Sequence, residues 1–296
     1  MSTSSREMGV GSLVLFFILT FAISWSVAGS MILFRSEIEA VTGPITGYNP
    51  VFILAVWGPA ISAFILISLR YGMKGLVNFV RRLTLWRMHW GWWAFLILSI
   101  PASRYFGAAL NGELSQPFPF SPWSDVIPAL VLTLIIGPVE EFGWRGFAQP
   151  LLQRKLAPFW ATIVLGAIWA LWHYPAFVIS GTPQNGGSFA LFVVSAMTIA
   201  LAFTAMFNAS RGSILIPVLF HFQANNVVWP DGRPWASLAM ILFAAIIVWL
   251  TREKMFRRDG GVTELLMETS PRTLGPESGK DSSGNRPLSR TAARDF

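Results

Sequence analysis

The sequence contains no cysteine and few charged residues. Without cysteine, a disulfide framework, a thiolate nucleophile and a cysteine-ligated metal are all excluded. Charged residues make up only 12% of the 296 residues, whereas a soluble domain carries about a quarter. Too little polar surface remains to face water on all sides, so the composition excludes a soluble globular domain.

Hydrophobic residues are abundant instead: they make up 53% of the chain, and its mean hydropathy is +0.54. They gather in repeated runs of about 20 residues, the length at which an α-helix crosses about 30 Å of hydrocarbon. We therefore predict an all-α, polytopic membrane helix bundle with about eight transmembrane helices in a lipid bilayer. The expected spans are residues 10–34, 51–69, 90–110, 126–149, 159–179, 188–208, 214–228 and 235–250.

The connections between these runs alternate in charge. The third and fifth lack Lys and Arg, and the first and seventh hold one arginine each beside acidic residues. The second, fourth and sixth are basic, with Arg70, Lys74, Arg81, Arg82, Arg87, Arg154, Lys155 and Arg211. The positive-inside rule therefore predicts that both termini lie in the cytoplasm. The net charge of +7 thus reflects topology, and no nucleic-acid partner is expected.

The chain divides into two parts by composition. Residues 1–258 hold all the apolar runs, including a first run that is too long for the core of a secretory signal and is expected to be retained. Residues 259–296 are rich in Gly, Ser, Pro, Arg and Glu and show no apolar periodicity. Such a segment buries too little apolar surface to order itself, so we predict a disordered cytoplasmic tail.

The fourth run contains three charged residues, each of which costs roughly 2.5–3.5 kcal/mol at mid-bilayer. Glu141 and Arg145 share one helical face four residues apart, so this pair can neutralise itself. Glu140 lies about 100° away around the helix and has no local partner. Pro138 removes a backbone donor just before it and can kink the helix. Glu140 is therefore either a functional acid or a structural one paired with a distant arginine, for which Arg104 is the candidate.

Two of the three histidines also lie in apolar runs. His173 follows Trp169 by four residues and His221 precedes Asn225 by four, so each pair shares a helical face. A lone histidine in a membrane helix is usually packed or hydrogen-bonded. Two of them together with an unpaired glutamate favour a functional site.

The helical hairpin between the fourth and fifth runs predicts where these groups meet. Glu140 and His173 lie at nearly equal distances on either side of a turn near residue 156, about 24 Å from it. His221 lies about 14 Å from the next turn on the same side. We therefore expect one pocket near the cytoplasmic face, with the hairpin projecting into the cytoplasm.

A glutamate, two histidines and an amide in a partly dry cavity can activate water and stabilise an oxyanion during amide hydrolysis. The Gly-x-Ser-x-Gly signature is absent, so water is the predicted nucleophile. Glu140, His173 and His221 also match the ligand types of hydrolytic zinc sites, although the contiguous His-Glu-x-x-His motif is missing. Spacing leaves both a zinc-dependent and a metal-free site open.

The sequence resembles the CPBP intramembrane proteases, a family that includes type 2 CAAX prenyl endopeptidases and Abi-like bacteriocin-processing or immunity proteins. The resemblance covers about residues 126–228, the expected catalytic core. It rests on three motifs in order, Glu140-Glu141-x-x-x-Arg145, Trp169-x-x-x-His173 and His221-x-x-x-Asn225. Trp169 stands where the family usually shows Phe, and it supplies the same aromatic wall.

The resemblance implies a role for each matched residue. Glu140 would activate water with help from His173. His221 and Asn225 would stabilise the oxyanion or, for His221, bind a metal together with the other two groups. Glu141 and Arg145, the other two residues of the first motif, would support this site.

The implied function is an intramembrane endopeptidase that hydrolyses a peptide bond near the cytoplasmic face. CAAX-type removal of a C-terminal peptide from a prenylated, membrane-associated protein is the first candidate substrate class. The implied location is the cytoplasmic membrane of a prokaryote.

Two other functions fit the same residues. In a transporter, Glu140, the histidines and Arg104 would form a proton or ion relay. In a non-catalytic immunity or scaffold protein, the fold would persist without the reaction. Substitution of Glu140 separates the three, because it would abolish hydrolysis, abolish coupled flux, or change stability alone.

Overall fold

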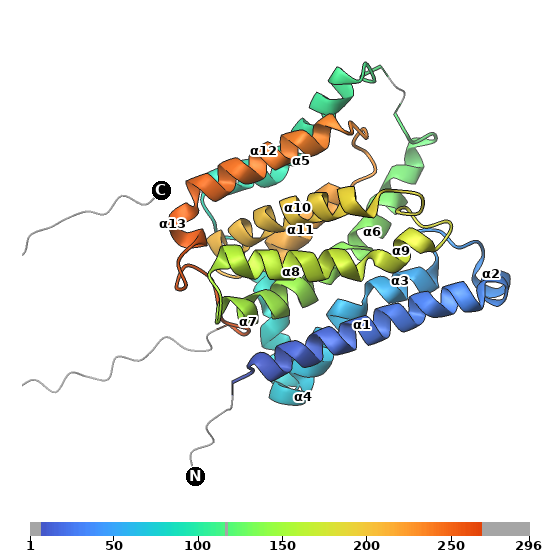
Figure 1. The fold of residues 1–296 in the computed structure, drawn as a ribbon. Coiled ribbons are helices and arrows are strands. Elements are labelled where there is room, and N and C mark those ends of the chain that lie inside the picture. The colour runs from blue at the N-terminus through green and yellow to red at the C-terminus, as the bar shows by residue number, and fades with distance from the viewer. Residues whose placement is uncertain (1–6, 116–117, 268–296) are drawn as a thin grey trace, which may run out of the picture.

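The computed structural model describes residues 7–115 and 118–267, and within these ranges the secondary structure is entirely helical (Figure 1). The α-helices are α1 (Val10–Leu33), α2 (Arg35–Thr42), α3 (Pro50–Val56), α4 (Gly58–Val80), α5 (Trp90–Leu110), α6 (Val126–Ile135), α7 (Gln149–Gln153), α8 (Pro158–Trp172), α9 (Tyr174–Val178), α10 (Phe189–Ala209), α11 (Leu215–Asn225), α12 (Trp235–Leu250) and α13 (Arg252–Met255). Short 3₁₀ turns cover Arg81–Thr84, Trp123–Asp125 and Pro138–Glu140, and a π-helix covers Phe142–Ala148.

The predicted all-α, polytopic architecture is confirmed, with fewer full spans than expected. Among the described residues, six helical segments are long and apolar enough to cross a membrane: Val10–Leu33, Gly58–Thr84, Trp90–Leu110, Trp123–Gln153, Pro158–Val178 and Phe189–Ala209. The last predicted span is the shorter apolar helix α12, and the seventh forms only α11, whose 11 residues extend about 16 Å. Helix α11 packs among α5, α6 and α10 inside the bundle.

The bundle has two chemically different ends. Figure 1 shows the start of α1, α7 and α13 at one end and α2 and α9 at the other. We call the first the basic end, because it carries residues 81–87, 154–157, 209–214 and 251–267. Hydrogen bonds join these segments: Arg82 donates to the Gly212 carbonyl at 2.8 Å, and Arg258 donates to the Lys155 carbonyl at 2.7 Å. We call the other the α2–α9 end.

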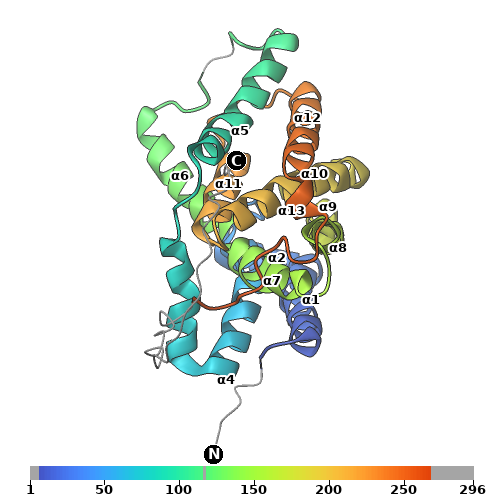
Figure 2. The same ribbon diagram turned by 90° about the vertical axis from the view of Figure 1, so that its left-hand side faces the viewer.

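Residues 259–267 pack onto the basic end, so the predicted disorder from residue 259 is wrong for these residues. Figure 2 looks onto this end, where the segment passes close to α7. Leu265 is buried at 3% exposure, and its carbonyl accepts a hydrogen bond from the Arg82 guanidinium at 3.2 Å. Gln153 of α7 donates to another carbonyl of the segment. Composition did not reveal these partners, which lie far away in sequence. The rest of the predicted tail, 268–296, lies outside the described residues.

The predicted fourth span is broken at its centre. Helix α6 ends at Ile135, and Gly137 follows with a φ of +80°, a conformation that glycine adopts without a Cβ penalty. Pro138 disfavours helical backbone at the residue before it, so helix α6 cannot continue through it. A 3₁₀ turn and a π-helix then carry the chain to α7. Such π segments often accompany functional sites, and this one positions Glu140 and Glu141.

The π-helix is held in place by a tightly packed core. Trp144 and Phe147 are fully buried, with ring centroids 5.7 Å and 5.0 Å from that of Phe16 on α1. Gly143 faces α4 so closely that a Cβ there would lie 2.5 Å from the Pro59 carbonyl oxygen. Dense packing of this kind permits little movement, so the carboxylates just before it have defined positions.

Candidate active site

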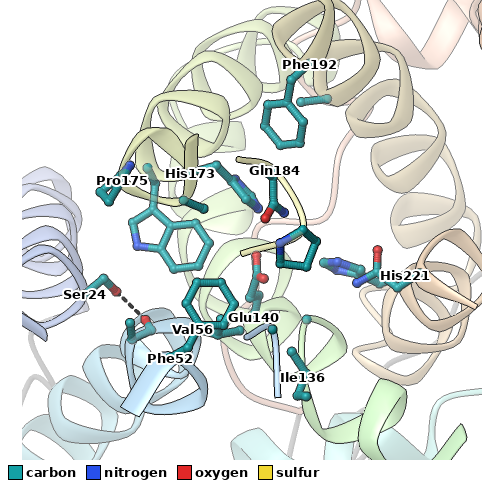
Figure 3. Close-up of a pocket in the computed structure, with 18 of the residues that line it drawn as sticks. Ser24, Phe52, Val56, Ile136, Glu140, His173, Pro175, Gln184, Phe192 and His221 are labelled. Carbon is teal, nitrogen blue, oxygen red and sulfur yellow. Dashed lines mark hydrogen bonds between the residues drawn. The ribbon is translucent and has the colours of Figure 1, made fainter. Parts of the chain in front are cut away.

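A cavity of about 650 Å³ opens beside the break in the fourth span. Its walls come from α1, α3, α8, α10 and α11, and they are mainly apolar and aromatic. Figure 3 shows the side chains of Glu140, His173 and His221 facing this common space, and Asn225 lines it as well. Glu140 is 3% exposed and His221 is 4% exposed. The structure therefore brings together groups from three separate segments in one secluded pocket of ligand-binding size.

Trp169 is the hydrogen-bond partner of Glu140. Its indole Nε1 donates to Glu140 Oε2 at 2.8 Å. The alternative partner Arg104 instead donates to the backbone carbonyl and carboxylate of Asp231, at 2.7 Å and 3.3 Å, so that pairing is wrong. Trp169 was expected only as an aromatic wall. A phenylalanine could not make this contact, because it lacks the indole N–H.

Glu141 is fully buried behind the cavity wall and has two partners. Arg145 lies 3.1 Å from its carboxylate, which confirms the predicted pair, and His221 Nδ1 lies 2.6 Å from its Oε1. The Arg145 guanidinium also stacks over Phe203, 4.0 Å from the ring centroid, and over Trp169, 4.7 Å away. A buried carboxylate requires such charge compensation. Glu141 and Arg145 therefore support the site from behind and do not line the cavity.

The two histidines are oriented by acceptors on their Nδ1 atoms. His173 Nδ1 lies 2.8 Å from the Trp169 carbonyl oxygen, which can only accept, so Nδ1 carries the proton and the neutral ring has its lone pair on Nε2. The contact between His221 Nδ1 and the Glu141 carboxylate orients the second ring likewise. A Cβ on Gly137 would collide with Asn225 Nδ2 and would lie 3.2 Å from His221 Nε2. These two nitrogens therefore lie side by side next to the bend.

This arrangement has the parts for hydrolysis by an activated water. Glu140 has one oxygen left beyond the Trp169 bond, and His173 has a free Nε2 as a second acceptor. The Asn225 amide always carries N–H donors, so its Nδ2 can donate a hydrogen bond to a developing oxyanion. His221 Nε2 can donate one only when both nitrogens of its ring are protonated. The mainly apolar walls lower the local dielectric constant, which strengthens such polar interactions.

The predicted metal ligands do not fit a zinc site as placed. Across the described part of the chain, no group of three His, Asp or Glu side chains could hold a metal ion. Glu140, His173 and His221 line the same cavity but do not converge on one point. One carboxylate oxygen of Glu140 already accepts a hydrogen bond from the Trp169 indole.

The cavity lies toward the α2–α9 end. Its lining includes residues 46–48 and Gly181, Pro183 and Gln184 from the two connections at that end, and it includes none from the basic end. The expected location of the pocket near the cytoplasm stays a prediction, because the positive-inside rule alone assigns the two ends of the bundle to the membrane faces. The α7–α8 turn lies at the same end of the bundle as α13 (Figure 1), and Glu140 is buried at 3% exposure.

Sequence reasoning missed several lining residues. Gly137 and the two uncharged connections were not expected at the site, although the Gly-Pro pair before Glu140 signalled a break. Ser24 also lines the cavity, where its hydroxyl donates to the Ala55 carbonyl at 2.7 Å (Figure 3). None of these residues belongs to a sequence motif. Only the packing of α1 and α3 against the bend brings them to the site.

Comparison with known proteins gives two matches. Residues 122–227 match the family described as type II CAAX prenyl endopeptidase Rce1-like. A curated protein of Methanococcus maripaludis named CAAX prenyl protease 2 is 30% identical over 179 residues, which covers 56% of this chain and 65% of that protein. The chain thus matches just under two thirds of the relative's length. The family match contains every residue singled out above for hydrolysis.

Proposed function

We propose that this chain, which is similar to the Rce1-like type II CAAX prenyl endopeptidases, is an intramembrane endopeptidase that hydrolyses a peptide bond inside the cavity described above. The observation that supports this proposal is the separation of two adjacent carboxylates. Glu140 faces the cavity, while Glu141 is turned away from it and neutralised by Arg145. One carboxylate is thus free for proton transfer.

In the proposed reaction, a water bound between Glu140 and His173 attacks the peptide carbonyl carbon. Glu140 takes the proton of the water as the new C–O bond forms, and Asn225 donates to the carbonyl oxygen as it gains negative charge. Glu140 then returns the proton to the peptide nitrogen when the C–N bond breaks. The products are a carboxylic acid and an amine, which exchange a proton to become a carboxylate and an ammonium group, so atoms and protons balance.

The remaining motif residues act as positioning residues. Trp169 holds one oxygen of Glu140, so the other oxygen faces the water. Arg145 and Glu141 orient the His221 ring from behind the wall. Preorganisation of this kind matters because displacement of a catalytic group by about 1 Å can reduce a rate about 100-fold.

The walls favour a substrate that is apolar on both sides of the cleaved bond. Phe52, Trp172 and Phe192 line the cavity, and its lining contains no Lys or Arg. A peptide next to a lipid-bearing or strongly apolar C-terminal segment suits this surface, and the names of the matches make a prenylated C-terminus the first candidate. We place the protein in the cytoplasmic membrane of a prokaryote.

Cleavage of a fluorogenic farnesylated CAAX peptide by the detergent-purified protein tests the proposal. A peptide of the same sequence without the farnesyl group measures what the lipid contributes. We expect wild-type hydrolysis, with loss of activity in Glu140→Gln and in His173→Ala. Equal cleavage by wild type and Glu140→Gln would refute the role of Glu140, and no cleavage of either peptide would refute the endopeptidase.

The same assay tests the metal question. The proposed reaction uses Glu140 and His173 directly on water, so a chelator should leave the rate unchanged. Loss of activity on chelation and its recovery with added Zn²⁺ would show that the side chains rearrange around a metal during turnover.

A further inference from the structure

We infer that Gln184, on the connection between α9 and α10, is a substrate-binding residue whose side-chain amide forms a hydrogen bond with the backbone of the peptide in the cavity. The inference rests on the proposed function for the identity of the ligand. Three observations support it: an unpaired buried oxygen, a connection that is held firmly in place, and mainly apolar surroundings.

The side-chain amide of Gln184 has an unpaired oxygen. Gln184 lines the cavity, and Figure 3 shows its side chain pointing into the space that Glu140 and His173 also face. Its Oε1 is buried and has no hydrogen-bond partner among the described residues. Trp172 also lines the cavity with an unpaired buried atom, but its indole N–H offers only a donor. Buried polar atoms are nearly always paired, so this unpaired acceptor indicates a place for a donor of the ligand.

The connection that carries Gln184 is held firmly in place. The backbone N–H of Gly187 donates to the Gln184 carbonyl at 3.0 Å, and the Thr182 hydroxyl donates to a carbonyl of α9. Arg35 at the start of α2 donates to the Ser180 carbonyl at 3.1 Å, which ties the connection to a second helix. The amide therefore extends into the cavity from a fixed point of the backbone, as a binding group requires.

The surroundings of Gln184 offer a peptide few other acceptors. The walls are mainly apolar, and the hydroxyls of Ser24 and Thr133 are already bonded to carbonyls of α3 and α6, at 2.7 Å and 2.8 Å. Glu140 acts on water in the proposed reaction. A substrate N–H that entered this cavity without an acceptor would lose its hydrogen bond to water without replacement, which is unfavourable. Gln184 supplies the missing acceptor.

A primary amide matches the peptide backbone in its hydrogen-bonding groups. It carries an acceptor oxygen and two N–H donors, so one glutamine side chain can pair with both the N–H and the C=O of a substrate peptide group. Such a contact recognises backbone and is independent of the substrate side chains, which the apolar walls accommodate. The ligand that fits is an extended peptide segment with apolar side chains, and Gln184 fixes its position relative to the reacting groups.

Ester replacements in the peptide test the contact, because each one exchanges a single backbone N–H for an oxygen. The probe is the farnesylated CAAX peptide with a fluorophore, together with a set in which each non-scissile amide in turn is replaced by an ester. Fluorescence anisotropy measures their binding to detergent-purified Glu140→Gln protein, so that the peptides stay intact. We expect one ester position to weaken binding about 3- to 10-fold, the usual contribution of a neutral hydrogen bond.

Gln184→Met, made in the same Glu140→Gln protein, keeps the length of the side chain but removes the amide. The all-amide peptide should bind about 3- to 10-fold more weakly, and the sensitive ester position should no longer matter. Asn185→Ala is the matched control, because Asn185 is exposed, does not line the cavity and donates to the Phe177 carbonyl at 3.1 Å. It should keep the ester pattern even if the thermal midpoint falls.

An ester pattern that Gln184→Met leaves unchanged would overturn the inference, and so would the absence of a sensitive position or of peptide binding. Turnover is measured separately with Gln184→Met in otherwise wild-type protein. We expect KM to rise about 3- to 10-fold with kcat unchanged, since the contact holds substrate and transition state alike. If wild type binds the peptides but cleaves none, the proposed function fails while the ester pattern still decides the role of Gln184.

Discussion

Two neighbouring glutamates in this protein have different surroundings, and this difference determines what each can do. Glu141 contacts Arg145 and His221, whereas Glu140 contacts one neutral donor, the Trp169 indole. A neutral partner leaves Glu140 able to accept and return a proton. Substitutions that change a single functional group of a site residue therefore test what that residue does.

Glu140→Gln keeps the size of the side chain and an oxygen that can accept from Trp169, but it removes the proton acceptor. We expect kcat to fall by about 10²- to 10⁴-fold, the usual contribution of general acid–base catalysis, with unchanged thermal stability. Steady-state kinetics on the fluorogenic peptide and thermal unfolding in detergent measure both quantities. Glu253→Gln makes the same change at an exposed residue of α13 and should retain wild-type kcat.

Trp169→Phe keeps an aromatic ring but removes the N–H that holds Glu140. A hydrogen bond to a charged group contributes about 1.5–3 kcal/mol, so we expect kcat to fall by about 10- to 100-fold with KM changed less than threefold. A purely structural role for Trp169 predicts the opposite: kcat per folded molecule would stay constant while the thermal midpoint fell.

At the scale of elements, the break in the fourth span is the feature on which the site depends. A regular helix through residues 126–149 would place Glu140 and Glu141 only about 100° apart on one cylinder. The bend at Gly137 and the π-helix that follows instead send one carboxylate to the cavity and the other to the core.

Gly137→Ala tests this element, because its Cβ would meet Asn225 and His221 in addition to straining the backbone at a φ of +80°. Gly112→Ala is the matched control, since Gly112 has a φ of +73° and open space around it. We expect each substitution to cost about 1–3 kcal/mol of unfolding free energy from strain. Hydrolysis should be lost only in Gly137→Ala, and equal activity of the two variants would contradict the proposed arrangement.

At the scale of the whole molecule, Arg82 joins the parts of the basic end. Its guanidinium donates to carbonyls of Gly212, Gly146 and Leu265, which belong to the α10–α11 connection, the π-helix and the C-terminal segment. It is buried at 2% exposure, so each of these carbonyls would lose its partner in a dry environment if the guanidinium were removed.

Arg82→Met should therefore destabilise the protein by several kcal/mol, at about 1–3 kcal/mol for each buried carbonyl left without a partner. We expect a lower thermal midpoint and faster proteolytic cleavage within residues 259–267. The neighbouring Arg81→Met, at an exposed position, should change stability by less than about 0.5 kcal/mol. Equal effects of the two substitutions would show that charge alone matters at this end.

Sequence alone determined the features that depend on local pattern. Apolar runs predicted the membrane bundle, because the thickness of the hydrocarbon sets their length. The spacing of Glu141 and Arg145 predicted their ion pair, because residues four apart on a helix are neighbours. The distribution of Lys and Arg separated the two ends of the bundle.

Tertiary structure alone decided the features that depend on partners distant in the chain. The Trp169 contact to Glu140, the packing of residues 259–267 on the basic end and the position of the cavity all arise from segments that no local pattern links. The end of the bundle toward which the cavity lies is one such feature: spacing gives the distance of Glu140 from its turn, but only the packing of the other helices shows which connections line the cavity.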